Sequence, residues 1–265
     1  MILSEPLLNP SDMFVRNKEE LETLREAGKI LHRVLDEVEK EIRPGVSTDA
    51  LNNKALEVMR HFGVKPSFLN YKPYGHKRGY PAAICTSVND EVVHGIPNEN
   101  PRVLKEGDII TIDSGLWLKE ICTDSARTVK VGKVSAKVEN LINVALKARE
   151  AQIKALKAGV KVFELGKAVE ELVRKSGYSS PDILGGHGVG RAVHEDPFIP
   201  NFYDPSMTHE FKEGEVLALE PIVIMGRPEV YLEKDGYTYK TKDGSWTAQF
   251  EHTVIVWEDK AEVIT

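Results

Sequence analysis

The chain has 265 residues, of which 41% are hydrophobic, and this is enough apolar sequence for one globular domain with a sizeable core. Its net charge of −6 at pH 7 argues against general nucleic-acid binding, which requires a basic surface. Two cysteines without a Cys-x-x-Cys motif do not support a disulfide framework. Residues 1–13 lack a basic segment followed by a long apolar core, and no apolar run approaches 18 residues, so we expect neither a signal peptide nor a membrane span. We therefore expect a cytoplasmic protein, and nothing requires more than a monomer.

Apolar residues at helical spacing predict two pairs of helices, each followed by β-rich sequence. The expected helices are 17–42, stopped by Pro44-Gly45; a helix capped by Thr48 that ends at Gly63; a helix capped by Ser135 that runs to about Lys157; and a helix after Gly159 that runs through Lys175 to Gly177. The β-rich stretches are 83–94, 107–132, 183–193 and 215–257, with turns at 235–236 and 242–244. Residues 68–80 are typical of an exposed loop. This order predicts an α/β (α+β) fold.

Two segments of the chain are copies of each other. Residues 105–113 and 212–220 are identical or chemically similar at eight of nine positions. A second match relates Gly45, Leu51 and Gly63 to Gly159, Leu165 and Gly177 with the same internal spacing. The offsets of 107 and 114 residues are too long for a solenoid repeat, so we interpret them as a duplicated half-domain. Halves facing each other about a pseudo-two-fold axis would place Asp113 and Glu220 at equivalent positions.

Five potential metal ligands lie in Gly-flanked or β-rich segments, namely Asp113, Asp124, His187, Glu220 and Glu251. Four carboxylates and one imidazole suit two hard or borderline divalent ions that share bridging carboxylates and activate water. Asp113 and Glu220 each close an apolar strand, where an unpaired charge costs several kcal/mol, so each implies a cation partner. The alternative is a salt bridge to Lys or Arg. The set predicts a di-metal hydrolase.

The hairpin spacing supports a further carboxylate beside Asp113. Asp124 follows eleven residues later, which would fold one carboxylate back beside the other; the alternative is an ion pair with Arg127. Glu251 lies in a strand before an apolar run, and its alternative is a pair with His252 or a lysine.

Three histidines stand in turn-forming or Gly-rich sequence. His187 lies among four glycines, which leave little side-chain packing for the imidazole and allow close approach of the backbone to a ligand. No Lys-Ser/Thr follows these glycines, so a phosphate loop is not indicated. For His94 and His194 the residues alone leave a surface turn and a functional role equally open.

These residues carry a resemblance to the type I methionine aminopeptidases, in order and spacing, from about Arg16 to the C-terminus. The motifs that carry it are Asn89-Asp90-Glu91-Val92-Val93-His94-Gly95-Ile96-Pro97, Ile112-Asp113-Ser114-Gly115, Thr123-Asp124, Gly186-His187-Gly188-Val189-Gly190, His194-Glu195-Asp196-Pro197, Leu219-Glu220-Pro221 and Ala248-Gln249-Phe250-Glu251-His252-Thr253.

The resemblance implies a pita-bread fold, in which two pseudo-symmetric α-β halves close over a di-metal centre. It implies one catalytic domain over 14–265 after a short extension, 1–13. It also implies two divalent ions, of Co, Mn, Fe or Zn, in which the Asp113 position chelates one metal, the Asp124 and Glu251 positions bridge both, and the His187 and Glu220 positions complete the other.

The activity implied is removal of the N-terminal methionine from nascent proteins when the second residue is small, by attack of metal-activated hydroxide on the first peptide bond. Glu220 is the general base implied, His94 contacts substrate and assists proton transfer, and His194 stabilises the tetrahedral intermediate. By similarity, Tyr80 and Cys85 line the methionine pocket, with Tyr71 and Tyr237 as walls. The partners implied are nascent N-termini at the ribosome, and because so few residues precede Phe14, we expect any docking there to use the catalytic domain.

The chain departs from the family pattern at two places. Residues 73–78 resemble an insertion of about six residues before Gly79-Tyr80-Pro81, and Val193 stands where the family often has an aromatic residue. Two alternatives stay open: a prolidase or aminopeptidase P-like hydrolase of X-Pro peptides, which normally carries a further N-terminal domain, and a non-catalytic pita-bread binding module.

Overall fold

The computed structural model describes Val15 and residues 17–265, so the predicted extension 1–13 lies outside the described residues. The helices are α1 (Lys18–Glu39), α2 (Thr48–Phe62), α3 (Ala136–Ala155) and α4 (Val162–Lys175). The strands are β1 (Lys65–Pro66), β2 (Ile84–Val88), β3 (Glu91–Val93), β4 (Ile109–Leu118), β5 (Ile121–Lys130), β6 (Gly185–Gly188), β7 (Glu195–Pro200), β8 (Val216–Leu219), β9 (Ile222–Ile224), β10 (Val230–Leu232), β11 (Tyr239–Thr241), β12 (Thr247–Gln249), β13 (His252–Val256) and β14 (Ala261–Val263).

Side-chain caps begin the helices close to the predicted positions. The Asn17 side chain accepts a hydrogen bond from Glu20 N at α1, and Ser135 accepts one from Val138 N at α3. At α2 the predicted cap is wrong by one residue, because Ser47 accepts the bond from Ala50 N while the Thr48 hydroxyl donates to Pro97 O at 2.8 Å. Two adjacent hydroxyls could both cap, and the chain that crosses nearby engages the second one.

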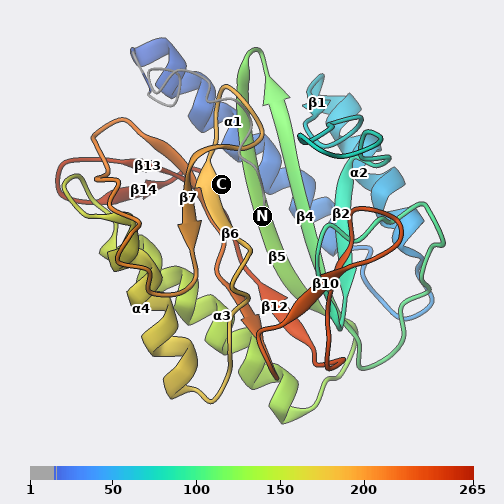
Figure 1. Ribbon diagram of the computed structural model, residues 1–265. Coiled ribbons are helices and arrows are strands. Elements are labelled where there is room, and N and C mark those ends of the chain that lie inside the picture. The colour runs from blue at the N-terminus through green and yellow to red at the C-terminus, as the bar shows by residue number, and fades with distance from the viewer. Residues whose placement is uncertain (1–14, 16) are drawn as a thin grey trace.

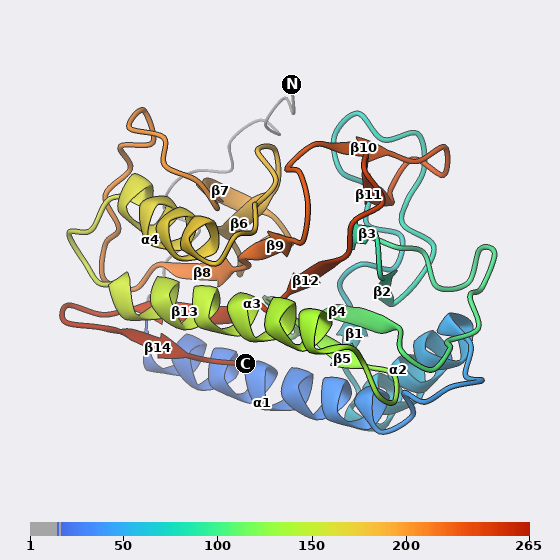
Figure 2. The same ribbon diagram turned by 90° about the horizontal axis from the view of Figure 1, so that it is seen from below.

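The strands form four sheets, of which the four-stranded and the five-stranded ones are the largest. The long β4–β5 hairpin runs through the middle of the molecule with α1 behind it (Figure 1). Figure 2 shows α1 and α3 on the same side of the strands, with α2 and α4 at opposite ends. On one side β4 pairs with β1, β2 and β5, and on the other the strand order is β14-β13-β8-β6-β7. The prediction of an α/β fold with two helix pairs is confirmed.

The two halves repeat each other down to single backbone hydrogen bonds. Gly107 N donates to Val131 O at 2.9 Å and Gly214 N donates to Val256 O at 2.8 Å, and both glycines have φ near +90°. After the first helix of each pair, Gly45 N donates to Leu104 O at 2.8 Å and Gly159 N to Phe211 O at 2.9 Å. The two pairs of glycines lie at the two offsets read from the sequence, so the predicted duplication is confirmed.

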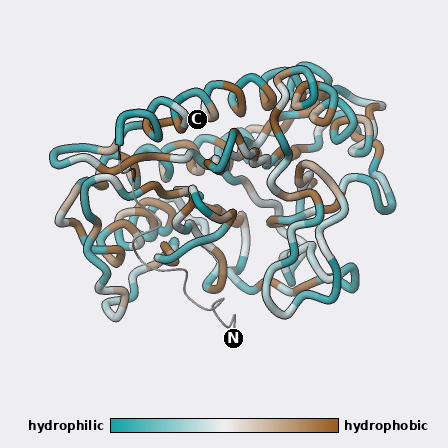
Figure 3. Tube along the Cα trace, turned by 90° about the horizontal axis from the view of Figure 1, so that it is seen from above, coloured by the Kyte–Doolittle hydropathy of each residue, from teal (hydrophilic) through white to brown (hydrophobic). Residues whose placement is uncertain are grey.

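The apolar core lies between the helices and the strands. Its largest fully buried side chains are Phe211, Leu24, Leu31, Leu35, Leu51, Met59, Ile84, Leu104, Ile109, Ile110, Ile112 and Leu116. Hydrophilic and hydrophobic residues alternate along the helices, and hydrophobic residues are frequent along the inner strands (Figure 3). The predicted loop 68–80 is exposed only in its middle, because Phe68 and Tyr80 at its ends are buried. Within the described part of the chain, no helix combines the length and apolarity needed to span a membrane.

Candidate metal centre

The β4–β5 hairpin brings Asp113 and Asp124 to one face. Asp113 stands opposite Ala126 and Asp124 stands opposite Gly115, so the two carboxylates are diagonal neighbours on facing strands. Both side chains are buried. The alternative partner of Asp124 is engaged elsewhere, because Arg127 forms ion pairs with Asp36 at 2.8 Å and Glu39 at 2.9 Å on α1.

The second half supplies the other three predicted ligands to the same place. Oxygen or nitrogen atoms of Asp124, His187 and Glu251 lie within 4.8 Å of one another, and all three residues are buried. Glu220, which follows β8, approaches His187, with 3.7 Å between Oε1 and Nε2. No Lys or Arg forms an ion pair with any of the five predicted ligands among the described residues.

The glycines around His187 serve the packing of strands. Strand β6 lies between β7 and β8, and a Cβ on Gly186 would lie 2.4 Å from Ala218 O. A Cβ on Gly188 would lie 2.3 Å from Asp196 O. These glycines therefore let three strands approach one another, a role that the sequence interpretation did not consider.

Two side chains that the sequence interpretation missed hold these ligands in place. The Thr253 hydroxyl accepts from Asp124 N at 2.8 Å and donates to Asp124 O at 2.7 Å. Gln249 Nε2 donates to Glu220 Oε2 at 3.0 Å. Both residues lie two positions from Glu251 in the sequence, and this closeness to a predicted ligand is the feature that could have indicated them.

Burial sets the protonation of the centre. Desolvation raises the pKa of Asp113 to about 7, although hydrogen bonds from its neighbours Asp124 and Cys85 oppose the rise. Desolvation also raises the pKa of Asp124, Glu220 and Glu251 well above the ordinary range, and the neighbouring carboxylates add to it. Four such groups cannot all be ionised together unless cations compensate them.

The ligand chemistry fits divalent cations. Asp113 Oδ1 and Asp124 Oδ1 are buried and accept no hydrogen bond from any described residue. Desolvation lowers the pKa of His187 to about 4, and its Nδ1 lies 2.8 Å from Gly188 O. A neutral ring that donates from Nδ1 to this carbonyl directs the Nε2 lone pair toward the carboxylates, as a metal-binding imidazole requires.

The other two histidines border the cluster. The His194 ring lies 4.5 Å from the His187 ring, centroid to centroid, and His194 Nδ1 lies 3.0 Å from the Tyr71 hydroxyl. His94 follows β3 with φ of 59°, an uncommon conformation for a residue with a side chain. Desolvation lowers the pKa of His94 to about 4 and that of His194 well below its ordinary value, so both rings are neutral at pH 7.

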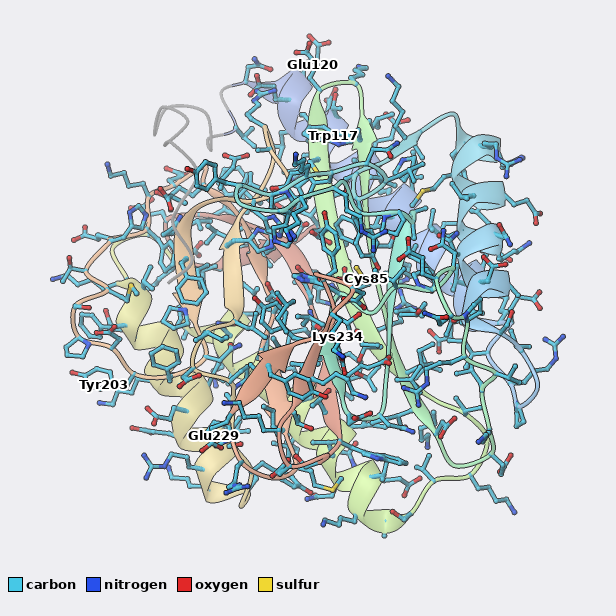
Figure 4. All side chains as sticks on the ribbon, turned by 45° about the vertical axis from the view of Figure 1, so that its right-hand side comes forward. Cys85, Trp117, Glu120, Tyr203, Glu229 and Lys234 are labelled. Carbon is cyan, nitrogen blue, oxygen red and sulfur yellow. The ribbon has the colours of Figure 1, made fainter. Side chains whose placement is uncertain are left out.

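The predicted pocket residues also gather here. Cys85 stands opposite Asp113 in the β2–β4 pair and lies near the middle of the molecule, while Trp117 and Glu120 mark the far end of the hairpin (Figure 4). Tyr80 and Tyr237 are buried, with ring centroids 5.1 Å apart and planes at 79°. Val193 is buried in the same apolar cluster as these residues. An apolar wall therefore adjoins the charged cluster.

Comparison with known proteins agrees with this geometry. The sequence profile of metallopeptidase family M24 matches residues 22–258. Methionine aminopeptidase of Aquifex aeolicus is 40% identical over 94% of this chain and 97% of its own length. The crystal structure of methionine aminopeptidase from Thermotoga maritima has a TM-score of 0.89 at 38% identity, covering 96% of this chain and 99% of that one.

More distant structures share the fold alone. The prolidase from Pyrococcus furiosus has a TM-score of 0.75 at 24% identity, and the match covers 96% of this chain but only 65% of the prolidase.

Proposed function

Because this chain belongs to the methionine aminopeptidases of metallopeptidase family M24, we propose that it removes the N-terminal methionine from peptides and nascent proteins whose second residue is small. The expectation of a pita-bread fold is confirmed by the likeness to solved members of the family. The rival X-Pro hydrolases are more distant, and the match leaves about a third of a prolidase uncovered.

The proposed metal centre uses all five ligands. Asp113, Asp124, His187, Glu220 and Glu251 would hold the divalent ions. Mn, Fe, Co or Zn suits this carboxylate-rich set with one imidazole. When bound, the ions supply Lewis-acid polarisation of the scissile carbonyl and neutralise the buried carboxylates.

Glu220 is the proposed general base. Its carboxylate is buried beside other carboxylates, and their negative charges repel one another. Burial raises the pKa of Glu220 toward the range in which a carboxylate can accept a proton from water. The hydrogen bond from Gln249 to Oε2 fixes the orientation of the Glu220 carboxylate. Glu220 then carries the proton to the leaving amine.

The neutral histidines are proposed to stabilise the reacting carbonyl. If the Tyr71 hydroxyl donates to His194 Nδ1, the proton of the neutral ring lies on Nε2, which becomes a donor. Such a donor can stabilise the developing oxyanion. His94, held in its strained backbone conformation, is proposed to contact the substrate amide and assist proton transfer.

The first side chain of the substrate is proposed to enter the apolar wall made by Tyr80, Cys85 and Tyr237, with Tyr71 at the edge. A thioether gains about 0.3–1.5 kcal/mol from each contact with an aromatic ring, which favours methionine over an aliphatic side chain of similar size.

The wider setting is also a proposal. We place the catalytic domain at 14–265 and expect a monomer that meets nascent chains in the cytoplasm near the ribosome. The acidic net charge would confine any ribosomal contact to a local surface.

One observation carries the proposed function: five ligands from two duplicated halves meet in a buried site where no Lys or Arg of the described residues compensates the carboxylates. The test is mass spectrometry of Met-Ala-Ser and Met-Lys-Ser peptides incubated with metal-reconstituted protein, beside Asp113→Asn. We expect methionine to be released from Met-Ala-Ser only, and the variant to release none. Cleavage of Ala-Pro peptides instead would favour an X-Pro hydrolase, and no release with Mn, Fe, Co or Zn would favour a binding module.

A further inference from the structure

The insertion at 73–78 leaves the fold around it intact because the chain closes before and after it. Asn70 N donates to Tyr80 O and Tyr80 N donates to Tyr71 O, both at 2.8 Å. A Cβ on Gly79 would lie 2.8 Å from Asn70 O, so only glycine permits this close approach. Residues 73–78 therefore form a loop whose two ends are joined by hydrogen bonds, beside the proposed pocket.

A tight turn aims one residue of the insertion inward. His76 N donates to Pro73 O at 3.1 Å, and Gly75 between them has φ of 84°, the arrangement of a type II turn. Within 74–78 every residue is exposed except His76, which is half-buried. The turn thus directs one imidazole toward the protein.

The imidazole covers a proposed wall of the substrate pocket. The His76 and Tyr237 rings lie 4.6 Å apart, centroid to centroid, with planes at 32°. Tyr237 also packs against Tyr80 in an edge-to-face arrangement. Tyr237 is therefore held between the insertion and the pocket.

Arg78 makes further contacts with Tyr237 and with the turn that precedes it. Its guanidinium forms an ion pair with Glu99 and donates to Asp235 O at 3.2 Å, while its carbonyl accepts from the Tyr237 hydroxyl. Asp235 Oδ1 in turn accepts from Tyr237 N at 2.8 Å. The insertion thus contacts Tyr237 through its ring, its hydroxyl and its turn.

From these contacts we propose that His76 is a specificity-determining positioning residue, which fixes the Tyr237 ring and thereby the width of the pocket for the first side chain of the substrate. The inference rests on the proposed function, because it assigns Tyr237 to that pocket. A ring that can tilt away would hold a narrow thioether less well and admit a wider, branched side chain.

The test compares His76→Ala with His76→Phe, and uses Tyr74→Ala as a control at the 63% exposed tip of the same loop. An aromatic pair contributes about 0.5–1.5 kcal/mol, so His76→Ala is expected to raise KM for Met-Ala-Ser roughly 2- to 12-fold with kcat little changed. The ratio of kcat/KM for Met-Ala-Ser to that for Leu-Ala-Ser should fall by a similar factor. The His76→Phe variant keeps a stacking ring and should restore both values, and the control should match wild type.

Unchanged KM and Met/Leu ratio in His76→Ala would overturn the proposal, as would failure of His76→Phe to restore them while both variants melt like wild type. Calorimetric binding of free L-methionine to the metal-loaded proteins provides a readout without turnover. If wild type binds methionine but cleaves no peptide, the proposed function fails while the weaker binding expected for His76→Ala still tests the role of His76. Equal affinities there would reject that role.

Discussion

Thr253→Val tests the link between β13, which begins directly after Glu251, and the backbone of Asp124. The substitution keeps the shape of a side chain that is fully buried and removes its hydroxyl, which binds both Asp124 N and Asp124 O. Two buried backbone groups then lose their partner. Each unsatisfied group costs about 1–3 kcal/mol, so we expect unfolding free energy to fall by about 2–6 kcal/mol. At roughly 2–4 °C per kcal/mol for a chain of this size, the melting temperature should fall by at least about 4 °C.

The same variant should also loosen the metal centre, because Asp124 is a proposed bridging ligand. Removal of an outer partner of a metal ligand typically weakens metal affinity about 10- to 100-fold, which calorimetric titration of the metal-free protein with Mn²⁺ would measure. Thr253→Ser is the control, since it keeps both hydrogen bonds and loses one methyl group, worth about 1 kcal/mol. If the Val and Ser variants melt together and bind Mn²⁺ equally, the hydroxyl does not hold Asp124 and the reasoning is refuted.

Three other predictions concern the centre itself. Asp124→Asn or Glu251→Gln removes a charge without changing side-chain size and should abolish metal content and methionine release together; elemental analysis that finds full metal would contradict the bridging assignment. His94→Ala should keep its metal but lose roughly 10²- to 10⁴-fold in kcat, the contribution typical of general acid–base catalysis, and an unchanged rate would remove His94 from the mechanism. The third follows from the pKa of Asp113, which burial raises from 3.8 to about 7. Between these two pKa values the folded metal-free protein holds a proton that the unfolded chain releases. The stability that Asp113 contributes is therefore fully present below the unfolded pKa and is lost as the pH rises through the folded pKa. Chelation should therefore lower the melting temperature more at about pH 7.5 than at about pH 5, whereas equal losses would show that metal does not compensate these carboxylates.

The parts of the fold that local pattern dictates could be predicted. Alternating β-branched residues and an eleven-residue spacing place Asp113 and Asp124 on one hairpin, and the repeated Lys-Glu-Gly-Asp/Glu segment reveals the two halves. The resemblance then named the remaining ligands, and their gathering is what the structure adds.

Contacts between distant residues could not be predicted. The bond of Thr253 to Asp124 joins residues 129 apart, and the stacking of His76 on Tyr237 joins a loop to a turn in the other half. No periodicity encodes such pairs, because they depend on how separately folded segments dock. Even the local choice of Ser47 over Thr48 as the cap depended on where a non-neighbouring segment, at Pro97, lies.

The duplicated halves contribute unequally to the centre. The aligned registers match Asp113 to Glu220, but Ser87 takes the place that corresponds to His187, and Ala126 takes that of Glu251. The first half therefore brings two of the proposed ligands and the second half three. If these residues hold the metal as proposed, tight binding requires both halves to be docked, and the free energy of metal binding stabilises the contact between them. On this proposal, a chain that has taken up metal has assembled its two halves correctly.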